Sequence, residues 1–266
     1  MSTSCLVTKL KGTVDDKNLS VLGKLKIDKI HADSSFISSY TNTISTNASA
    51  KLTSPDSNFV DASGNSLGNE ITINGSNQIF RLAPSTGEFF IDKYVITKFS
   101  TYYYPANVDI HLKDLAYMTN LIELNCPLSG DLQDLERLDS IQTLTIKGNS
   151  PITGDIANLS KFATLESISM TAVPSPGISG NIKSLGNLTS LTKLVLSQGV
   201  LGNVSGTIEE FVQSQRENGR TTCNSFGLTC FGPTITFNGT TISSSSEKVL
   251  SWTASTITYD GVTINV

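Results

Sequence analysis

Charged residues, histidines and long apolar runs are all scarce in this sequence of 266 residues. Lysine, arginine, aspartate and glutamate together make up 16% of the chain, and His31 and His111 are its only histidines. The net charge of -4 and the pI near 5.2 exclude the basic field that attracts nucleic acid. No apolar run approaches the roughly 18 residues of a membrane helix. We therefore expect neither nucleic-acid binding nor membrane insertion.

The sequence also lacks the marks of an exported, disulfide-linked protein. Its first residues do not combine a basic segment with the apolar run of about 7–15 residues that a secretory signal needs. The four cysteines Cys5, Cys126, Cys223 and Cys230 are too scattered for a disulfide framework or a zinc site. Cys223 and Cys230 remain candidates for pairing across the loop between them, although reduced thiols are the default without a signal.

Serine, threonine, asparagine and glycine take the place of the missing charged and apolar residues, which is typical of β-structure with hydroxyl-rich surfaces. Within this background a segment of the form Ser/Thr-Gly-x-Ile/Leu recurs, with its glycine at Gly130, Gly154, Gly180 and Gly206. The intervals of 24, 26 and 26 residues fall in the window of about 20–29 residues that leucine-rich repeats use.

An apolar ladder accompanies each of these segments. One copy consists of Leu185, Leu188, Leu191, Leu194 and Leu196, at steps of three, three, three and two residues. Steps of three indicate a helical turn and the final step of two indicates a strand, so each copy passes from a turn into a strand. The same ladder occurs in Leu115–Cys126, Leu135–Ile146 and Leu159–Met170.

These copies are similar to leucine-rich repeats of the plant type, in which the Ser-Gly-x-Ile segment adds a second short sheet. The resemblance is clearest from Gly186 to Ile208. It implies a right-handed leucine-rich-repeat solenoid over residues 101–220, with each Leu-x-Leu pair pointing inward. The sequence departs from the family at the asparagine ladder, because Asn149 fits the usual position whereas the stretches that begin at Thr171 and Ser197 lack one. We expect irregular convex turns there.

The outward strand positions of the repeats are the candidate binding residues, on the concave face that the resemblance implies. Most are small and polar, unlike the aromatic and arginine-rich centre of a tight interface. We expect either a plain solvent-exposed scaffold or a weak site for a polyhydroxyl ligand. The ten positions are Glu123, Asn125, Thr143, Thr145, Lys147, Ser167, Ser169, Lys193, Val195 and Ser197.

A capping helix is predicted directly after the last repeat. Thr207 and Glu210 fit a capping box, and Gly219 fits the residue at which a helix stops. One apolar face of this helix is expected to cover the last repeat. That face consists of Ile208, Phe211, Val212 and Gln215.

Two hairpins of similar sequence follow the helix. Thr234–Ile242 and Thr256–Ile264 alternate around an Asn-Gly and an Asp-Gly pair, which are typical of type I′ turns. Trp252 lies on a strand between them and is expected to pack in the core, with an exposed sugar-stacking role as the alternative. The run Tyr102–Tyr104 is likewise interpreted as packing rather than as an aromatic contact patch.

The N-terminal region is predicted to contain strands separated by a polar stretch. Residues 31–69 are dominated by Ser, Thr, Asn and Asp, so we expect a neighbouring subunit to order them. The predicted strands are Leu6–Leu10, Lys24–Ile27, Ile71–Gly75 and Phe89–Phe99.

The predicted fold class is mainly β with short helices. Four parts are expected along the chain. They are an N-terminal β attachment segment (1–30), a polar arm with β-strands (31–100), the solenoid with its capping helix (101–220) and paired β-hairpins (221–266).

No catalytic, cofactor or metal site is predicted. The sequence contains no nucleophile elbow, no P-loop and no His-Glu-x-x-His motif, and both histidines are interpreted as surface or satisfied residues. Asp131 and Asp155 recur at one repeat position, where a glycosidase pair or a calcium site is conceivable. Asn181 and Thr207 occupy the same position in later copies, so polar turn residues are the better interpretation.

A broader resemblance bears on function. The opening Cys5–Gly12, the helix end Gln213–Arg220 and the tail with its Ile-Thr-Phe-Asn-Gly and Ile-Thr-Tyr-Asp-Gly segments resemble proteins of gut Bacteroides-type bacteria and their tailed phages. The resemblance implies a non-enzymatic structural protein. We expect an oligomeric phage virion component, in a head or tail fibre or decoration, that displays the repeats for surface or receptor binding during host attachment.

Its expected partners are other virion proteins and copies of itself, with a host-surface glycan or protein as a candidate ligand. Its expected location is the virion, after assembly in the host cytoplasm. The alternative is a bacterial leucine-rich-repeat adhesin at the cell surface. An enzyme, such as a glycan-degrading one, is the third hypothesis.

Overall fold

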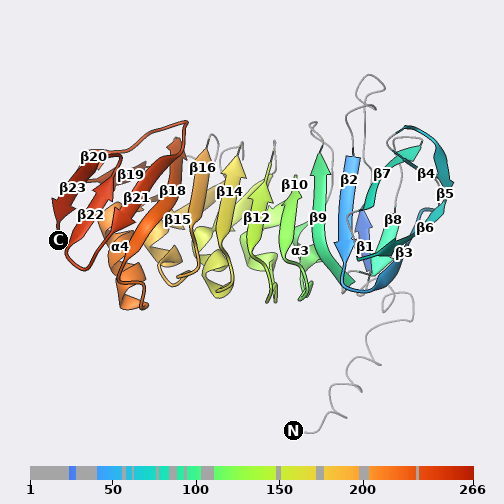
Figure 1. The fold of residues 1–266 in the computed structure, drawn as a ribbon, viewed down its shortest axis with the longest axis horizontal. Helices are drawn as coiled ribbons and strands as arrows, with labels where there is room; N and C mark the ends of the chain where they lie inside the picture. Colours follow the sequence, from blue (N-terminus) through green and yellow to red (C-terminus); the bar gives the residue numbers. More distant parts are fainter. Residues whose placement is uncertain are drawn as a thin grey trace, which may run out of the picture.

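The computed structural model is mainly β with few short helices, as the sequence predicted. Its strands lie side by side along the long axis of the molecule, from the N-terminal strands in blue to the C-terminal strands in red (Figure 1). They form sheets of thirteen, six and four strands. The described residues are 24–27, 41–55, 58–61, 63–75, 78–83, 89–92, 95–102, 111–147, 151–171, 177–197, 204–231 and 234–266.

A run of parallel strands forms the centre of the thirteen-stranded sheet. In order they are β9 (Ile96–Tyr102), β10 (Glu123–Cys126), β12 (Thr143–Ile146), β14 (Ser167–Thr171), β16 (Lys193–Ser197) and β18 (Cys223–Phe231). Leu144 pairs with Ile168, and Ile168 pairs with Leu194, so these three buried side chains form one inward column. That predicted column is confirmed. The run extends beyond residues 101–220 at both ends, because β9 and β18 continue it.

The Ser/Thr-Gly-x-Ile/Leu segments form the six-stranded sheet on the opposite side of the core. Its strands are β11 (Gly130–Asp131), β13 (Ile152–Asp155), β15 (Ile178–Asn181), β17 (Val204–Thr207), β19 (Thr234–Phe237) and β20 (Thr240–Thr241). A helix follows each of the first four of these strands. These helices are η3 (Leu132–Asp134), η4 (Ile156–Lys161), η5 (Ile182–Leu185) and α4 (Ile208–Glu217).

The polar residue of each segment caps the helix that follows it. The side chains of Asp131, Asp155 and Asn181 accept hydrogen bonds from the backbone amide two residues further on, at 2.9, 2.8 and 2.8 Å. Such bonds satisfy amides that have no partner inside the helix. The interpretation of the recurring Asp131 and Asp155 as turn residues is therefore confirmed.

The recurring glycine lets each copy approach the cap of the copy before it. Gly180 has a φ of +111°, and a Cβ built on it would lie 2.2 Å from Oδ1 of Asp155. Gly154 stands in the same relation to Asp131, with 2.4 Å. A side chain at these positions would meet both a steric clash and an unfavourable backbone conformation. The anchor glycine is thus the contact point between neighbouring copies.

The predicted capping helix is α4. Oγ1 of Thr207 accepts a hydrogen bond from the amide of Glu210 at 3.0 Å, and Gly219 follows the helix with a φ of +95°. Its predicted apolar face is buried as a whole. Because Nε2 of Gln215 donates to the carbonyl oxygen of Leu188 at 3.1 Å, the one polar group on that face is also satisfied.

An aromatic cluster closes the core between α4 and the large sheet. Trp252 is 2% exposed and lies at 6.4 Å from Phe211 and 6.1 Å from Phe226, measured between ring centroids. Its Nε1 donates to the carbonyl oxygen of Arg220 at 3.0 Å, and the Arg220 guanidinium stacks over its ring. The core role predicted for Trp252 is confirmed, and the sugar-stacking alternative is excluded.

Both predicted hairpins are present, one in each large sheet. β19 and β20 end the six-stranded sheet, whereas β22 (Thr256–Tyr259) and β23 (Val262–Asn265) end the thirteen-stranded sheet beside β21 (Lys248–Trp252). Both turn residues have positive φ in each hairpin, as type I′ turns require. The hairpins are not paired with each other through backbone hydrogen bonds. They meet through Phe237 and Tyr259, whose ring centroids are 5.7 Å apart.

The polar segment 31–69 is folded within the chain wherever it is described. It contains β2 (Thr41–Thr46), β3 (Ser49–Thr53), β4 (Asn58–Val60) and β5 (Ser66–Gly68). β2 pairs with β9 and so extends the large sheet, while Leu52 and Phe59 are fully buried. The expectation that a neighbouring subunit must order this segment is therefore wrong for its described residues between Thr41 and Asn69.

The remaining N-terminal strands complete the sheets. The four-stranded sheet contains β1 (Lys24–Ile27), β3, β6 (Glu70–Asn74) and β8 (Phe89–Asp92), and β7 (Gln78–Ala83) joins β2 to β4. The predicted strands at 24–27, 71–75 and 89–99 are therefore present, the last of them divided into β8 and β9. Predictions for Cys5, Leu6–Leu10, His31, Tyr103, Tyr104 and Asn149 lie outside the described residues.

Cys223 and Cys230 do not form the disulfide that was left open. Both belong to β18, where they are seven positions apart along one extended strand, about 23 Å at the usual rise per residue. This separation is far beyond the reach of a disulfide. Cys126, Cys223 and Cys230 are free and buried.

Candidate interaction face of the parallel sheet

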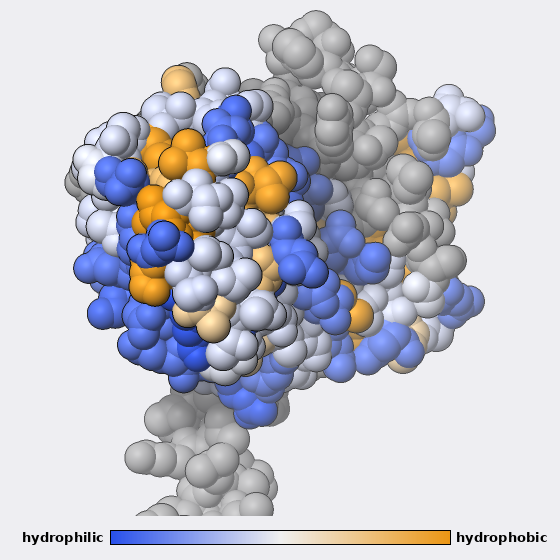
Figure 2. Space-filling model, turned by 60° about the vertical axis from the view of Figure 1, so that its left-hand side comes forward, coloured by the Kyte–Doolittle hydropathy of each residue, from blue (hydrophilic) through white to orange (hydrophobic). Residues whose placement is uncertain are grey.

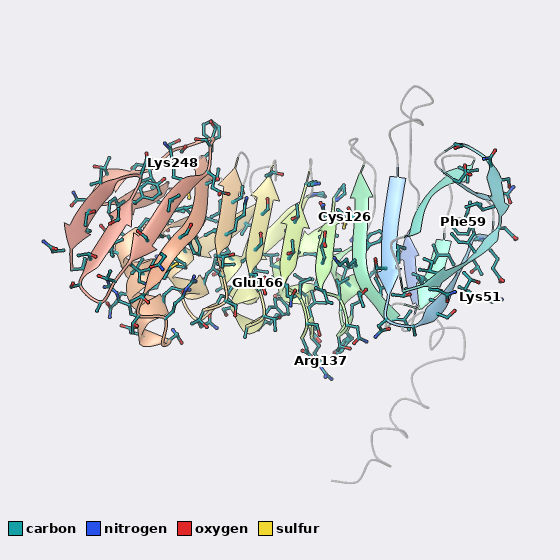
Figure 3. All side chains as sticks on the ribbon, viewed as in Figure 1. Lys51, Phe59, Cys126, Arg137, Glu166 and Lys248 are labelled. Carbon is teal, nitrogen blue, oxygen red and sulfur yellow. The ribbon has the colours of Figure 1, made fainter. Side chains whose placement is uncertain are left out.

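The ten predicted positions lie on or directly beside β10, β12, β14 and β16. Figure 3 marks the two ends of these strands, with Cys126 at the end of β10 and Glu166 just before β14. Backbone pairing arranges eight of the ten in two rows across the sheet. The first row is Glu123, Thr143, Ser167 and Lys193, and the second row is Asn125, Thr145, Ser169 and Val195.

These eight side chains point away from the buried columns because successive residues of a strand face opposite sides of the sheet. Lys193 is exposed and the other seven are half-buried. The structure therefore brings the predicted residues together on one surface, which we call the polar face. The face is shallow, since most of its members are small.

Ion pairs close both ends of the first row. Nζ of Lys98 lies 3.2 Å from Oε2 of Glu123, and Nζ of Lys193 lies 2.6 Å from Oε2 of Glu247. All four side chains are at least one third exposed, so each pair contributes little to stability. The pairs do balance the charges of the row, so that Lys98, Glu123, Lys193 and Glu247 together carry no net charge.

Gly227 makes room for the second of these pairs. It lies beside Lys193 on β18, and a Cβ at this position would come within 2.8 Å of the Glu247 carboxyl carbon. Glu247 therefore lies across the gap that Gly227 leaves and reaches Lys193 from the loop before β21.

The second row is uncharged. Asn125, Thr145 and Ser169 present amide and hydroxyl groups at the spacing of neighbouring strands, about 4.8 Å. Oδ1 of Asn125 is buried and has no hydrogen-bond partner among the described residues. Such a row offers both donors and acceptors to a ligand that carries many hydroxyl groups.

The last two predicted positions lie beyond the rows. Lys147 directly follows β12 and is half-buried. Burial raises the pKa of the neighbouring Cys126 thiol, and the positive charge of Lys147 opposes this rise. Ser197 ends β16, where its backbone pairs with Thr171 and Phe231.

Among the described residues no group of three or more His, Cys, Asp and Glu side chains is placed to hold a metal ion. His111 and Ser129 do meet, with Nδ1 and Oγ 2.9 Å apart, but they lie beside the six-stranded sheet. His111 occupies the capping position of α3 (Leu112–Leu115), which corresponds to Asp131 in the next copy.

Sequence reasoning missed Lys98 and Glu247. Lys98 belongs to β9, which has no Ser/Thr-Gly anchor in the expected frame, and Glu247 belongs to a serine-rich loop outside the repeats. The repeat pattern carries no signal for either residue. The similarity of Phe226-Gly-Leu-Thr-Cys to the Leu-x-Leu strands could have indicated β18, the strand on which Gly227 lies beside Lys193.

Two hollows lie away from the polar face, around α4. One of about 300 Å³ is bordered by Glu209, Arg216, Ile257 and Val266 among others. The other, of about 450 Å³, is lined by serine and lysine side chains of η4, η5 and α4 and by Asn181 and Asn187, which flank η5. Both are open to solvent, and neither contains a predicted residue.

Comparison with known proteins gives no match to a family model, a curated protein or a solved structure. Of the helices in the described part of the chain, none is long and apolar enough to cross a membrane.

Proposed function

We propose that this chain is a non-enzymatic interaction protein built on a right-handed leucine-rich-repeat solenoid. The observation that carries the proposal is the polar face, in which one row is neutralised by ion pairs and the other presents uncharged hydroxyl and amide groups. A regular and shallow surface whose row of charges is paired suits contact with an extended partner better than it suits the enclosure of a reacting group. The in-register Leu-x-Leu columns and the glycine-to-cap contacts support the solenoid.

We further propose that the protein is an oligomeric component of a phage particle, in a head or tail fibre or decoration. The resemblance of its sequence segments to proteins of tailed phages supports this setting. The open strand edge at the C-terminal end of the large sheet supports assembly, because free edges are sites of pairing between chains.

Mass spectrometry of purified particles tests this setting. We expect the chain at a fixed ratio to the major structural proteins of the particle. Recovery from the bacterial cell surface alone, with none in particles, would contradict the virion proposal and establish the adhesin alternative in its place.

A separate experiment tests the polar face. Thr145→Arg places a long charged side chain in the middle of the second row, and Thr241→Arg makes the same change on the exposed β20 of the other sheet. We expect Thr145→Arg to abolish binding to a glycan array or to host cells, whereas Thr241→Arg retains it. Equal binding by both variants would identify the face as plain scaffold.

A further inference from the structure

β23 forms the C-terminal edge of the thirteen-stranded sheet in the described structure. One side of this strand pairs with β22, in the register Thr256 with Asn265 and Tyr259 with Val262. No described strand pairs with its other side. Figure 2 brings this end of the molecule forward and shows apolar surface between polar side chains.

The turn geometry determines which backbone groups face outward. In a two-residue hairpin the residues that flank the turn exchange hydrogen bonds, and the pattern then alternates along the strands. Val262 and Ile264 are therefore bonded to β22, and the amide of Val266 continues the pattern by donating to Ser255 at 3.0 Å. The N–H and C=O groups of Thr263 and Asn265 point to the open side.

The apolar side chains of β23 continue the core but are only partly covered. Val262 and Ile264 lie opposite Tyr259 and Ile257 and share their side of the sheet. Tyr259 and Ile257 are buried, whereas Val262 is 53% and Val266 is 55% exposed. Val262 and Ile264 of β23, and Val266 directly after it, are thus three apolar side chains that the described structure leaves incompletely packed.

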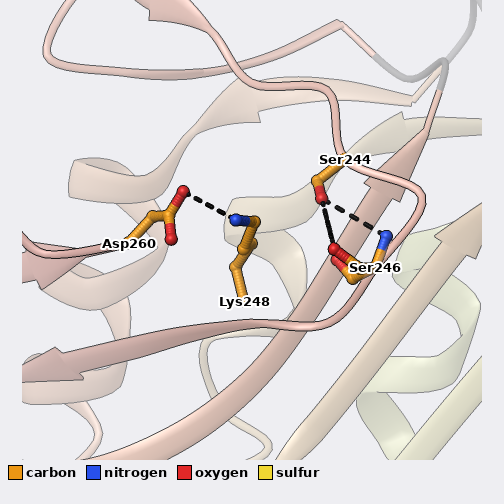
Figure 4. A network of polar contacts seen from close by, with 4 residues as sticks. All are labelled: Ser244, Ser246, Lys248 and Asp260. Carbon is orange, nitrogen blue, oxygen red and sulfur yellow. Dashed lines mark hydrogen bonds and ion pairs between the residues drawn. The ribbon is translucent and has the colours of Figure 1, made fainter.

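The two edges of the sheet differ in how they are protected. β5, at the other edge, has three residues, ends at Gly68 with a φ of +83° and joins β4 through a bulge. Short length and bulges are devices that discourage pairing with another chain. β23 has no charge, no proline and no bulge in its pairing with β22. Asp260 in its turn is already held by Lys248 at 3.0 Å (Figure 4).

We propose that β23 is a self-association edge, at which two copies of this chain pair antiparallel about a twofold axis through Ile264. In this register Thr263 of each copy lies opposite Asn265 of the other, so the outward N–H and C=O groups form four hydrogen bonds. Val262 lies opposite Val266, and Ile264 lies opposite its own counterpart.

A second copy fits better than an unrelated strand because β23 is self-complementary. The apolar positions of β23 and of the residue after it, Val262, Ile264 and Val266, are symmetric about Ile264, so each copy covers the apolar side chains of the other. The strand has no charged side chain that would meet a like charge across the axis. The proposed function requires contacts between copies of the chain, and this pairing would supply one. In this respect the inference rests on the proposed function.

The association should be weak, because two short strands bury far less area than a stable dimer does. Sedimentation of the full-length chain over a concentration series into the millimolar range is therefore the suitable measurement. Val262→Lys places a charge in the contact, and Val249→Lys is the matched control, since both valines are 53% exposed and Val249 lies on β21. We expect at least tenfold weaker association for Val262→Lys and no change for Val249→Lys.

Thr263→Pro provides a second, independent variant. It removes one outward N–H and leaves the hydrogen bonds to β22 in place, as proline at a strand edge allows. We expect the same weakening, with the near-ultraviolet circular dichroism of Trp252 unchanged as a check of folding. A monomer at all concentrations overturns the proposal, and so does association that Leu67→Lys at β5 abolishes while Val262→Lys leaves it intact. Absence of the chain from phage particles contradicts the proposed function and leaves the sedimentation result unaffected.

Discussion

At the residue scale, the glycine of each repeat and the cap of the preceding repeat form one structural unit. Gly180 faces the carboxylate of Asp155, which at the same time accepts the amide of Ala157 at 2.8 Å. The carboxylate cannot move away from a new side chain without giving up its capping hydrogen bond. Steric fit, backbone conformation and helix capping are therefore coupled at a single contact.

We predict that Gly180→Ala lowers the free energy of unfolding by about 2–5 kcal/mol, through backbone strain together with overpacking. Gly219→Ala is the control, because Gly219 also has a positive φ but a Cβ at this position would have no described atom within 4 Å. Its loss should be about 1 kcal/mol. Urea denaturation measures both values. Similar losses in the two variants would show that the contact with Asp155 contributes nothing.

Two buried groups that can lose a proton, the Cys230 thiol and the Tyr259 hydroxyl, make the stability of the fold depend on pH. Burial raises the pKa of the Cys230 thiol from about 9 to about 12, and burial is also the main cause that raises the pKa of Tyr259 to about 12. Between the unfolded and folded pKa values the folded chain retains protons that the unfolded chain has lost. Stability from these groups is therefore complete below the unfolded pKa and decreases as the pH rises toward the folded pKa.

We predict that the free energy of unfolding is level near neutral pH and falls above about pH 9. Each thiol that ionises only on unfolding adds a slope of about 1.4 kcal/mol per pH unit. Cys230→Ala should remove the share of one thiol from this slope. Guanidinium denaturation at a series of pH values provides the measurement, and a profile that stays level up to pH 11 would contradict the predicted burial of the thiols.

At the scale of elements, columns of buried side chains that cross several strands are a main source of the stability of the fold. Leu144, Ile168 and Leu194 each contact a neighbour in the copy before and the copy after. A vacancy in such a column cannot close without shifting whole strands, because neighbouring strands are held in register by their hydrogen bonds.

Replacement of Leu144, Ile168 or Leu194 by alanine should each cost about 2–5 kcal/mol, since each change leaves a cavity in a packed column. Val195→Ala, on the half-buried outer row of the same strand as Leu194, should cost clearly less. Thermal or urea denaturation of the four variants tests the register. Losses below about 0.5 kcal/mol at all three column positions would reject it.

Elements that depend on residues close together in the sequence were predicted correctly, whereas elements and contacts that depend on distant residues were missed. The ladder of Leu185–Leu196, the capping helix and both hairpin turns depend on residues a few positions apart, and all are found in the structure. β2 escaped prediction because Ile44 is its one strongly apolar residue, so pairing with the distant β9 orders it. Glu247 escaped because its contact with Lys193 depends on Gly227, a residue without a side chain.

At the scale of the whole molecule, the N-terminal strands β2, β4, β5 and β7 share one sheet with the repeats. β2 pairs along its length with β9, and β9 pairs with β10. We therefore expect residues 41–53 to be folded in an isolated chain, without contact with a second copy.

We predict that hydrogen exchange of the full-length chain shows protected amides in β2 and β3 at low concentration, where association through β23 is absent. Protection should not change with concentration, because these amides bond to strands of the same chain. Protection that appears only at high concentration would show that contacts between copies order this region after all.

The repeated contact between a glycine and the preceding cap also has a consequence for heredity. Gly154 meets Asp131, Gly180 meets Asp155 and Gly206 meets Asn181 in nearly the same way. Loss or duplication of one whole copy in the gene would bring together a glycine and a cap that already fit. Unequal recombination can thus lengthen or shorten the polar face by a whole strand while both ends of the protein are inherited unchanged.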